Sequence, residues 1–217
     1  MSRTPPVVAV DGPAGAGKSA VGRRVAAALG VPFVDSGMFY RAAAFLGYEG
    51  GIAPDDQERL VEIASDPALH ISEGRIYLAE RDLTDQIHRP EINLTLSAIS
   101  QVAPFRNAVN ERLRRLAAAG VVMAGRDIGT VVLPSTPLKF FLTASLNERL
   151  RRRLAQKQRR GEEADAAAME QEIAARDLAD STRLVAPLRP ATDATIIDTE
   201  QLDLDQVVER IVERVLR

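Results

Sequence analysis

Residues 12–19, Gly-Pro-Ala-Gly-Ala-Gly-Lys-Ser, constrain the fold of this chain more than any other segment. Their spacing fits the phosphate-binding loop pattern G-x-x-x-x-G-K-[ST]. Glycines let the backbone direct its N–H groups around an oligophosphate, and the start of a following helix adds positive partial charge. A short apolar run precedes the loop at residues 7–10, and a helical pattern follows it at residues 19–29. The segment therefore predicts a strand, a loop that binds a nucleoside triphosphate, and a helix, in that order.

Two side chains of the loop have specific predicted roles. Lys18 can reach the β- and γ-phosphates of ATP, and the Ser19 hydroxyl can hold Mg²⁺, the cofactor expected with this co-substrate. The residues expected to bind the donor nucleotide are Gly12, Pro13, Ala14, Gly15, Ala16, Gly17, Lys18, Ser19 and Ala20. Asp11 directly precedes the loop and has three open interpretations: it orients the loop, it aids Mg²⁺ binding, or it shapes a turn.

Composition excludes several other classes of protein. The 217 residues are 46% hydrophobic and 27% charged, which is typical of a soluble globular protein. A net charge of −2 argues against a nucleic-acid partner. The absence of cysteine removes disulfides, thiolate zinc sites and cysteine nucleophiles. No segment has the apolar core of a signal peptide or the length of a membrane span, so no membrane partner and a cytoplasmic location are expected.

Strand and helix patterns alternate along most of the chain and predict an α/β fold with a doubly wound parallel sheet of five strands. The expected strands are residues 7–10, 33–34, 121–124, 138–142 and 195–197. The expected helices are residues 19–29, 38–46, 54–63, 93–102, 105–119, 147–160, 162–178 and 204–216. Short strands at residues 69–71, 75–78 and 83–84 interrupt this rhythm and predict a small β insertion.

Polar clusters follow the first three long strands, at residues 12–19, 35–36 and 126–127. Ligands of doubly wound folds bind at the carboxyl ends of the strands, so the three clusters are expected to form one active site. An anionic acceptor of the phosphoryl group needs additional cations there. The chain offers arginines, whose planar fork binds phosphate in a bidentate manner; the candidates are Arg41, Arg126, Arg176 and Arg183.

Five segments resemble, in their order along the chain, the motifs of bacterial cytidylate kinase, a family of P-loop nucleoside monophosphate kinases. They are Asp-Ser-Gly-Met-Phe-Tyr-Arg at 35–41, Ser-Gln-Val-Ala at 100–103, Gly-Arg-Asp-Ile-Gly-Thr at 125–130, Arg-Asp-Leu-Ala-Asp-Ser-Thr-Arg at 176–183 and Ala-Pro-Leu at 186–188. The similarity covers nearly the whole chain and includes the β insertion. It implies one P-loop kinase domain over residues 1–217, with a monophosphate-binding insertion at 38–105 and a helical lid at 148–176.

The resemblance also implies in-line transfer of the ATP γ-phosphate to CMP or dCMP. A monomer is expected. In this family pattern Ser36, Arg41 and Arg126 hold the acceptor phosphate, Tyr40 lies beside the sugar, Arg176 and Asp180 contact the ribose, and Arg183 faces the phosphates. The catalytic residues implied are Lys18, Arg126, Arg153, Arg176 and Arg183.

Recognition of the base is implied for Ser100 and Asp127. An ionised carboxylate accepts a hydrogen bond from the exocyclic amine of cytosine, whereas uracil presents a carbonyl there, so UMP is disfavoured. The chain departs from the family at an arginine that also contacts the base. An ungapped alignment puts that position at Val109 and an alignment on the neighbouring valine puts it at Asn110, while Arg106 lies about one turn earlier.

The basic stretch at residues 147–160 has two interpretations. Its cations are Arg149, Arg151, Arg152, Arg153, Lys157, Arg159 and Arg160. They pair with the acidic stretch that follows, or they form a lid that closes over ATP and excludes water. We expect a mixture, with Arg153 and Arg159 on the phosphates and the others solvated or paired. Asp177 is expected only to orient an arginine.

Two alternative functions remain open from the sequence. One is the same fold acting on UMP or on a metabolite that is not a nucleotide, in which case Asp127→Asn hardly changes the choice of acceptor. The other is a P-loop NTPase that works as a switch or a nucleic-acid motor and hydrolyses ATP without a small acceptor. The arginines expected at several strand ends argue against the second alternative, because a switch needs no second phosphate pocket.

Overall fold

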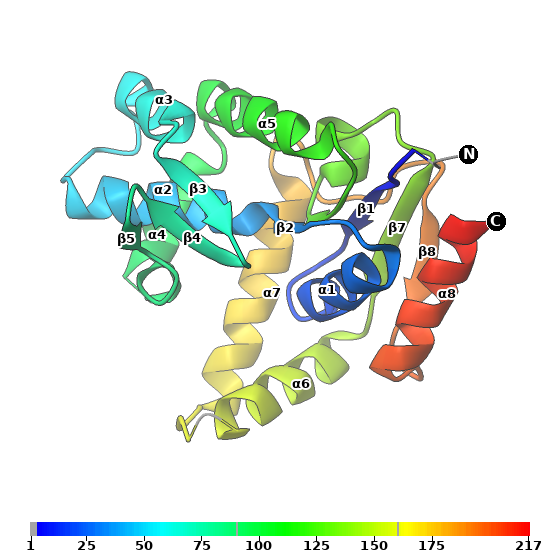
Figure 1. Ribbon diagram of the computed structural model, residues 1–217. Helices are drawn as coiled ribbons and strands as arrows, with labels where there is room; N and C mark the ends of the chain where they lie inside the picture. The colour runs from blue at the N-terminus through cyan, green and yellow to red at the C-terminus, as the bar shows by residue number, and fades with distance from the viewer. Residues whose placement is uncertain (1–3, 90, 160) are drawn as a thin grey trace.

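A parallel five-stranded sheet forms the centre of the computed structural model, which describes residues 4–89, 91–159 and 161–217 (Figure 1). The strand order is β2-β6-β1-β7-β8, and every neighbouring pair is parallel. The strands are β1 (Val7–Asp11), β2 (Phe33–Asp35), β6 (Val121–Gly125), β7 (Leu138–Thr143) and β8 (Thr195–Asp198). The predicted α/β fold with five parallel strands is confirmed.

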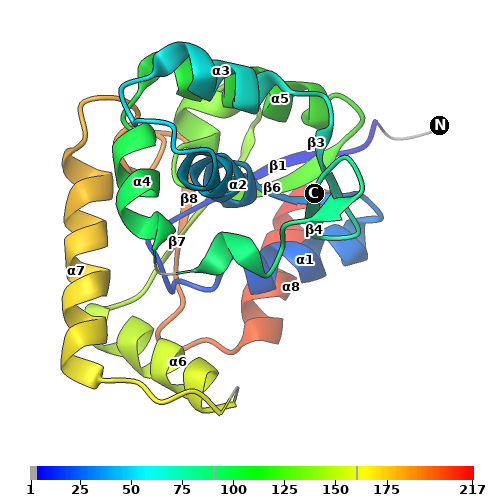
Figure 2. The ribbon, with the colours of Figure 1, turned by 90° about the vertical axis from the view of Figure 1, so that its left-hand side faces the viewer.

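Alternating side chains of the central strand β1 divide the core in two. Val8 and Val10 face helices α1 (Lys18–Leu29) and α8 (Leu204–Leu216), whereas Ala9 faces the opposite side. That side is covered by α2 (Ser36–Glu49), α4 (Ile92–Ile99) and α5 (Ala103–Ala117). Figures 1 and 2 show α1 and α8 together on one side of the sheet and α5 on the other. Strand β1 is thus buried on both faces, as is usual for strands of a parallel sheet.

The insertion consists of α3 (Gln57–Ser65) and an antiparallel sheet in the order β3-β4-β5. Its strands are β3 (Leu69–Ser72), β4 (Arg75–Leu78) and β5 (Arg81–Asp82), and a 3₁₀ turn, η1 (Gln86–His88), leads on to α4. The prediction of a strand at residues 83–84 was wrong. The Asp82 carboxylate accepts a hydrogen bond from the backbone N–H of Thr84 (2.8 Å) and turns the chain there, so the strand ends at Asp82.

Helices α6 (Leu146–Arg159) and α7 (Ala166–Thr182) extend away from the carboxyl edge of the sheet and meet at their connection (Figure 1). Helix α7 begins four residues later than predicted. The side chain of Asp165 caps it by accepting hydrogen bonds from the N–H groups of Ala167 and Ala168. The proposed lid at 148–176 covers parts of both helices, and its movement stays a prediction, as do the boundaries of the insertion.

None of the helices in the described part of the chain has the combination of length and apolar character needed to cross a bilayer.

Candidate active site

The phosphate-binding loop leaves the carboxyl end of the central strand and enters α1. At Gly12, where φ is 148°, a Cβ would lie 2.2 Å from the carbonyl oxygen of Leu142 on β7. The first turn of the loop is therefore packed directly against the neighbouring strand, and only glycine fits. Gly17, with φ of 88°, is the residue before α1 begins at Lys18. The loop N–H groups and the positive end of α1 thus occupy the same edge of the sheet.

Lys18 is buried, with 8% of its surface exposed, and its ammonium group donates to the carbonyl of Pro13 at 2.7 Å. Burial lowers the pKa of Lys18 well below its usual value, and the positive charges of Arg126 and Arg176 lower it further. A cation held under these conditions gains strongly from the arrival of an anion. The lysine predicted for the β- and γ-phosphates is therefore in a site that favours phosphate.

Ser19 and Asp35 form an oxygen-lined site beside the loop. The Ser19 hydroxyl donates to one carboxylate oxygen of Asp35 at 2.7 Å, and the other oxygen accepts from the N–H of Gly37 at the start of α2. Hydroxyl and carboxylate oxygens suit Mg²⁺, which usually takes few protein ligands and completes its shell with water and phosphate oxygens. The described residues contain no cluster of three or more His, Cys, Asp or Glu side chains that could hold a metal ion. The pair fits a metal ion that the nucleotide brings with it, and Asp35 is a candidate ligand that the sequence interpretation missed.

Three predicted arginines approach this edge of the sheet without counterions. Arg176 is on α7, Arg153 is on α6, and neither makes a hydrogen bond or ion pair with the described residues. Arg41 on α2 makes no ion pair among them and donates weakly to the carbonyl of Ile87, at 3.3 Å. Burial lowers the pKa of Arg176 to about 10, with repulsion from Arg126 and Arg41 adding to the effect. Burial also lowers the pKa of Arg41, and repulsion from Arg153 is the next largest cause.

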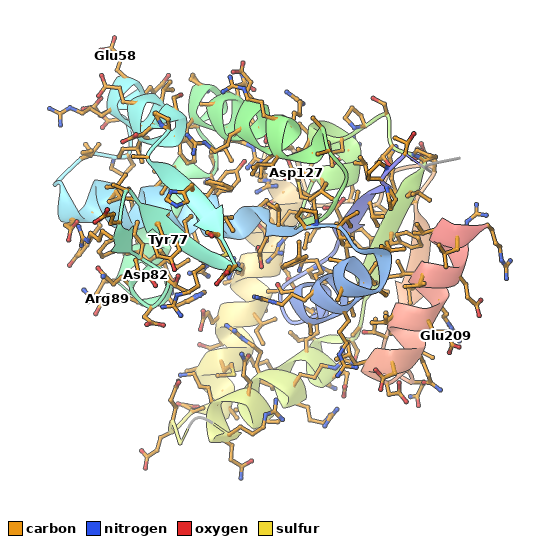
Figure 3. The ribbon with its side chains drawn as sticks, viewed as in Figure 1. Glu58, Tyr77, Asp82, Arg89, Asp127 and Glu209 are labelled. Atoms are coloured by element: carbon orange, nitrogen blue, oxygen red, sulfur yellow. The ribbon has the colours of Figure 1, made fainter. Side chains whose placement is uncertain are left out.

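A second set of arginines is paired with carboxylates. Arg126 donates to Asp180 at 2.8 Å, and Arg183 lies 3.6 Å from Asp180 and 3.7 Å from Asp127. Asp127 receives a hydrogen bond of 2.6 Å from Arg106, and both of these side chains are less than 10% exposed. Figure 3 shows Asp127 in the interior beneath α5, in contrast to Glu58 and Glu209, which project outward. The structure thus brings the predicted residues at 126–127 together with those at 180 and 183.

Arg106, about one turn before the position that the alignment left open, has further contacts in this network. Its guanidinium also donates to the carbonyl of Ser100 at 3.0 Å and lies 5.1 Å from the centre of the Tyr40 ring. Val109 instead packs in the core, and Asn110 is buried without a hydrogen bond to its side-chain oxygen. Arg106 therefore connects the residues expected to read the base with the residue expected beside the sugar. The signal in the sequence was the position of Arg106 six residues after Ser100.

The remaining predicted acceptor residues lie close to this network. Ser36 is 5% exposed, and a Cβ added to Gly125 would lie 2.6 Å from its hydroxyl oxygen, so Ser36 sits against the backbone just before Arg126. The Ser100 hydroxyl donates to the carbonyl of Ser97 at 2.9 Å within its own helix. Ser100 therefore contacts the network through its carbonyl group.

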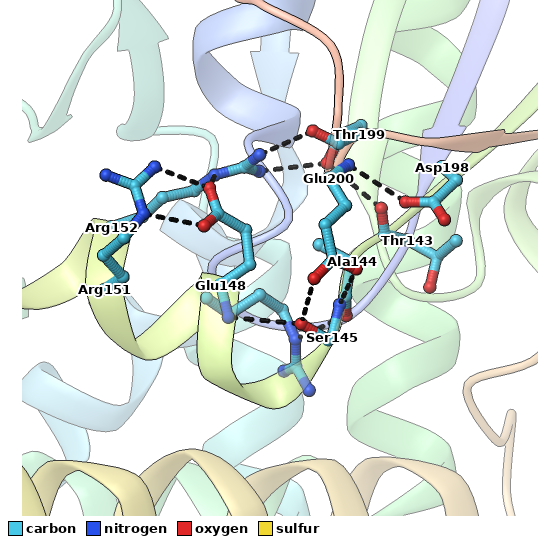
Figure 4. A network of polar contacts seen from close by, with 10 residues as sticks. Thr143, Ala144, Ser145, Glu148, Arg151, Arg152, Asp198, Thr199 and Glu200 are labelled. Atoms are coloured by element: carbon cyan, nitrogen blue, oxygen red, sulfur yellow. Dashed lines mark hydrogen bonds and ion pairs between the residues drawn. The ribbon is translucent and has the colours of Figure 1, made fainter.

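Two cations of the basic stretch, Arg149 and Arg152, connect α6 to neighbouring elements. Glu148 accepts hydrogen bonds from Arg151 and Arg152 at 2.7 Å, and Arg152 also donates to Thr199, which follows β8 (Figure 4). Arg149 donates to the carbonyl of Ala14 in the phosphate loop and pairs with Asp177 at 2.5 Å.

Pairing of the basic stretch was expected, but the main partners are wrong in that prediction. In the described residues two pairs reach the following stretch at 162–178: Lys157 with Glu162 at 3.4 Å, and Arg149 with Asp177. Glu148 instead lies on the same helix as the arginines it binds, because residues three and four apart on a helix are neighbours. Asp177 does orient an arginine, Arg149. Arg159 is exposed, and Arg160 lies outside the described residues.

Comparison with known proteins identifies relatives along nearly the whole chain. The family described as cytidylate kinase matches residues 8–217. The cytidylate kinase of Caldanaerobacter subterraneus subsp. tengcongensis is 41% identical over 209 residues, which cover 96% of this chain and 93% of that protein. The cytidylate kinase of Pelotomaculum thermopropionicum is 42% identical over 216 residues, covering 97% of this chain and 96% of the relative.

Solved structures with lower identity share the fold. A gluconokinase from Sinorhizobium meliloti superimposes with a TM-score of 0.51 at 19% identity, covering 99% of this chain and 94% of that one. Shikimate kinase from Acinetobacter baumannii gives a TM-score of 0.50, also at 19% identity, with 98% and 94% of the two chains covered. Both similarities identify the architecture and carry no information on the acceptor.

Proposed function

The chain belongs to the cytidylate kinase family of nucleoside monophosphate kinases, and from this premise we propose that it transfers the γ-phosphoryl group of ATP to CMP and dCMP, giving CDP and dCDP. The observation that carries the proposal is the division of the site into two parts at one edge of the sheet. One part holds the buried Lys18 and half-buried arginines that make no ion pair with the described residues, and the other holds the paired carboxylate Asp127. The first part suits the phosphates of the two nucleotides, and the second part suits the uncharged nucleoside of the acceptor.

The donor side is built on the phosphate loop. We assign residues 12–20 to the ATP phosphates, with Lys18 stabilising the negative charge that develops during transfer. Ser19 and Asp35 would hold Mg²⁺, which when bound neutralises charge on the phosphate oxygens. Arg153 on α6 lies near Arg41 and Arg176 and would close over the donor, excluding water that competes as an acceptor.

The acceptor phosphate requires cations of its own because its charge repels the γ-phosphate. Arg41 and Arg126 would hold it together with the Ser36 hydroxyl, and arginine suits this role because its fork binds two phosphate oxygens at once. Arg176 and Arg183 would stabilise the transferring group. Asp180 is anchored by Arg126 and would accept a hydrogen bond from the sugar, which Tyr40 adjoins.

The base is assigned to Asp127. Arg106 occupies one carboxylate oxygen at 2.6 Å, while the nearest nitrogen of Arg183 is 3.7 Å from the other, beyond hydrogen-bonding distance. That oxygen is free to accept from the exocyclic amine of cytosine. Uracil would present a carbonyl to a carboxylate whose orientation Arg106 fixes, and two acceptors facing each other are unfavourable.

The test is ADP release from MgATP with CMP, dCMP, UMP, AMP or no acceptor, for the unaltered protein and for Asp127→Asn. We expect strong stimulation by CMP and dCMP and weak stimulation by UMP and AMP. Asp127→Asn should reduce the preference for CMP over UMP, because the amide offers both a donor and an acceptor. Equal rates with UMP would refute cytosine selection, and release that no nucleotide stimulates would favour an NTPase without a small acceptor. We also expect a monomer, which sedimentation of the purified protein would test.

A further inference from the structure

The segment at residues 126–132 carries Arg126 and Asp127 and continues as the helical turn η2 (Ile128–Val132). Two side chains outside the proposed pocket, Asp11 and Arg114, hold the backbone of this segment. We propose that both are positioning residues for acceptor selection, because they fix the place and orientation of Asp127. The inference rests on the proposed function and adds to it residues that do not touch the substrate.

Asp11 holds the beginning of the turn from the side of the sheet. Its carboxylate is buried, and its two oxygens accept from the N–H groups of Ile128 (2.8 Å) and Gly129 (2.7 Å). Since both oxygens are used in this way, the interpretation that Asp11 aids Mg²⁺ binding is not supported. The contact is also tight, because a Cβ on Gly129 would lie 3.3 Å from one Asp11 oxygen.

The position of Asp11 in the sheet links the two halves of the site. Asp11 is the last residue of β1, opposite Gly125 of β6 in the parallel register, and Gly12 begins the phosphate loop immediately after it. One strand end therefore starts the donor loop and, through a side chain, fixes the acceptor segment. A shift of this strand end would change the distance between donor and acceptor.

The charge on Asp11 is held at a cost to folding. Burial raises its pKa to about 6 and the nearby charge of Asp127 acts in the same direction, while the two N–H groups oppose the shift. A neutral residue would avoid this penalty. A carboxylate at this position makes two strong, charge-assisted hydrogen bonds to the backbone of the acceptor segment. The need to hold that segment explains why a buried charge is present despite its cost.

Arg114 holds the end of the same turn from helix α5. Its Nε donates to the carbonyl of Val132 and its Nη2 to the carbonyl of Val131, both at 2.9 Å. Arg114 lies eight residues after Arg106, about two helical turns, so the two arginines share one face of α5. Arg106 binds the side chain of Asp127, and Arg114 binds the backbone carbonyls at the end of η2. Asp11 binds the backbone N–H groups at the start of η2, between these two contacts.

The experiment compares Asp11→Asn and Arg114→Gln with the unaltered protein. The amide introduced by Asp11→Asn keeps the shape of the carboxylate but presents N–H groups to one of the two backbone donors, so the turn should loosen. We expect the ratio of kcat/KM for CMP to that for UMP to fall about tenfold to hundredfold, mainly through the KM of CMP, because small misplacements near reacting groups have effects of this size. The affinity for ATP alone should stay within about twofold of the unaltered protein, since the phosphate loop is not altered.

Two matched controls separate positioning from general loss of stability. Thr136→Val removes a buried hydrogen bond to the carbonyl of Val7 at the opposite end of β1. Arg115→Gln removes the exposed neighbour of Arg114 on α5, which pairs only with Glu111 in the described chain. Both controls should keep the CMP/UMP ratio, even where the melting temperature falls. Amide hydrogen exchange in residues 126–132 should accelerate in Asp11→Asn and Arg114→Gln and stay unchanged in the controls.

The proposal is overturned if the folded test variants keep the CMP/UMP ratio, or if the controls lower it equally. It is also overturned if ATP affinity falls as much as the affinity for CMP, because Asp11 would then serve the donor loop. The proposed function fails separately, when the unaltered protein prefers another acceptor. In that event the ratio of kcat/KM for the preferred acceptor to that for CMP is measured in every variant. A fall in this ratio that is confined to Asp11→Asn and Arg114→Gln still supports the positioning role.

Discussion

Two groups of cations meet at the carboxyl edge of the sheet, and they differ in whether the protein supplies their counterions. Arg106, Arg126 and Arg183 face the carboxylates of Asp127 and Asp180 at distances of 2.6 to 3.7 Å. The uncompensated group has no ion pair among the described residues and consists of Lys18, Arg41, Arg153 and Arg176. Both groups are cationic and lie in one site, but only the first group has its charge balanced by carboxylates of the protein.

The difference indicates what each part of the site is built to receive. A buried cation without a counterion weakens folding, which is the meaning of the lowered pKa values of Lys18 and Arg176. Such an arrangement is relieved when phosphates bind. A carboxylate already neutralised by arginine suits an uncharged partner such as a base or a sugar hydroxyl. The electrostatics of the free protein thus agree with phosphates on one side and a nucleoside on the other.

The largest effect is expected from Lys18→Met, which removes the central cation of the uncompensated group. Turnover with saturating ATP and CMP should fall about a thousandfold, because stabilisation of transferring charge is the main catalytic contribution. Steady-state ADP release measures it. Lys139→Met is the matched control, since Lys139 is also buried but is paired with Asp193. Turnover near that of the control would mean that the loop backbone alone carries this role.

Arg106→Met tests the paired group by leaving Asp127 as a buried carboxylate without its closest partner. The free energy of unfolding should fall by about 3–5 kcal/mol, the usual result of breaking one side of a buried ion pair. Urea denaturation followed by circular dichroism measures this change. A variant as stable as the unaltered protein would show that Arg183 or solvent is enough to balance the charge of Asp127. The distinction between a paired and an uncompensated group of cations would then lose its support.

Arg176→Met should have the opposite sign. Burial and repulsion from Arg126 and Arg41 outweigh the attraction of Asp180 for Arg176. Its replacement should therefore raise the free energy of unfolding by about 1 kcal/mol, while turnover falls, as in other cases where a site trades stability for activity. The same urea titration, run with and without nucleotide, measures both states. Loss of stability in the nucleotide-free protein would contradict the view that Arg176 is uncompensated.

The smallest expected effect is the uptake of protons when nucleotide binds near Lys18. The pKa of Lys18 is lowered in the folded, nucleotide-free protein, so between that value and its ordinary pKa of 10.5 the unfolded chain binds more protons than the fold does. The penalty from Lys18 is therefore present at lower pH and disappears as pH rises through this window. Phosphates restore the charge, so MgATP binding near the upper part of the window should take up a fraction of a proton.

Calorimetric titration in two buffers of different ionisation enthalpy measures that uptake. Lys18→Met should abolish it, whereas Lys139→Met should leave it unchanged. Binding heats that do not depend on the buffer in the unaltered protein would mean that Lys18 is already charged before nucleotide arrives.

The central sheet is predicted well from the sequence, because short apolar runs rich in β-branched residues are typical of buried parallel strands and of few other structures. Errors occurred where a single side chain redirects the backbone. Asp82 turns the chain before the predicted strand at 83–84, and Asp165 sets the start of α7 by capping it. Neither effect follows from hydrophobic patterns.

Within the site, the sequence predicts which kinds of residue follow each strand but not how they pair. Arg126 and Asp180 are 54 positions apart, and their contact depends on how α7 returns to the sheet. The choice among Val109, Asn110 and Arg106 depends on the rotation of α5, which its buried apolar residues determine. Each step along a helix turns the side chain by about 100°, so an uncertainty of one residue changes the partner.

The contact between Gly12 and Leu142 has a consequence for protein engineering. The two outer glycines of the phosphate loop carry different constraints: at Gly12 the carbonyl of β7 excludes every side chain, whereas at Gly17 no atom lies within 4 Å of an added Cβ. Within the protein itself, Gly17 is constrained by its backbone angle, which asparagine tolerates better than most residues. A randomised library should recover glycine alone at the first position and some asparagine at the second. Efforts to change the donor nucleotide should accordingly vary the end of the loop, because its beginning is part of the sheet.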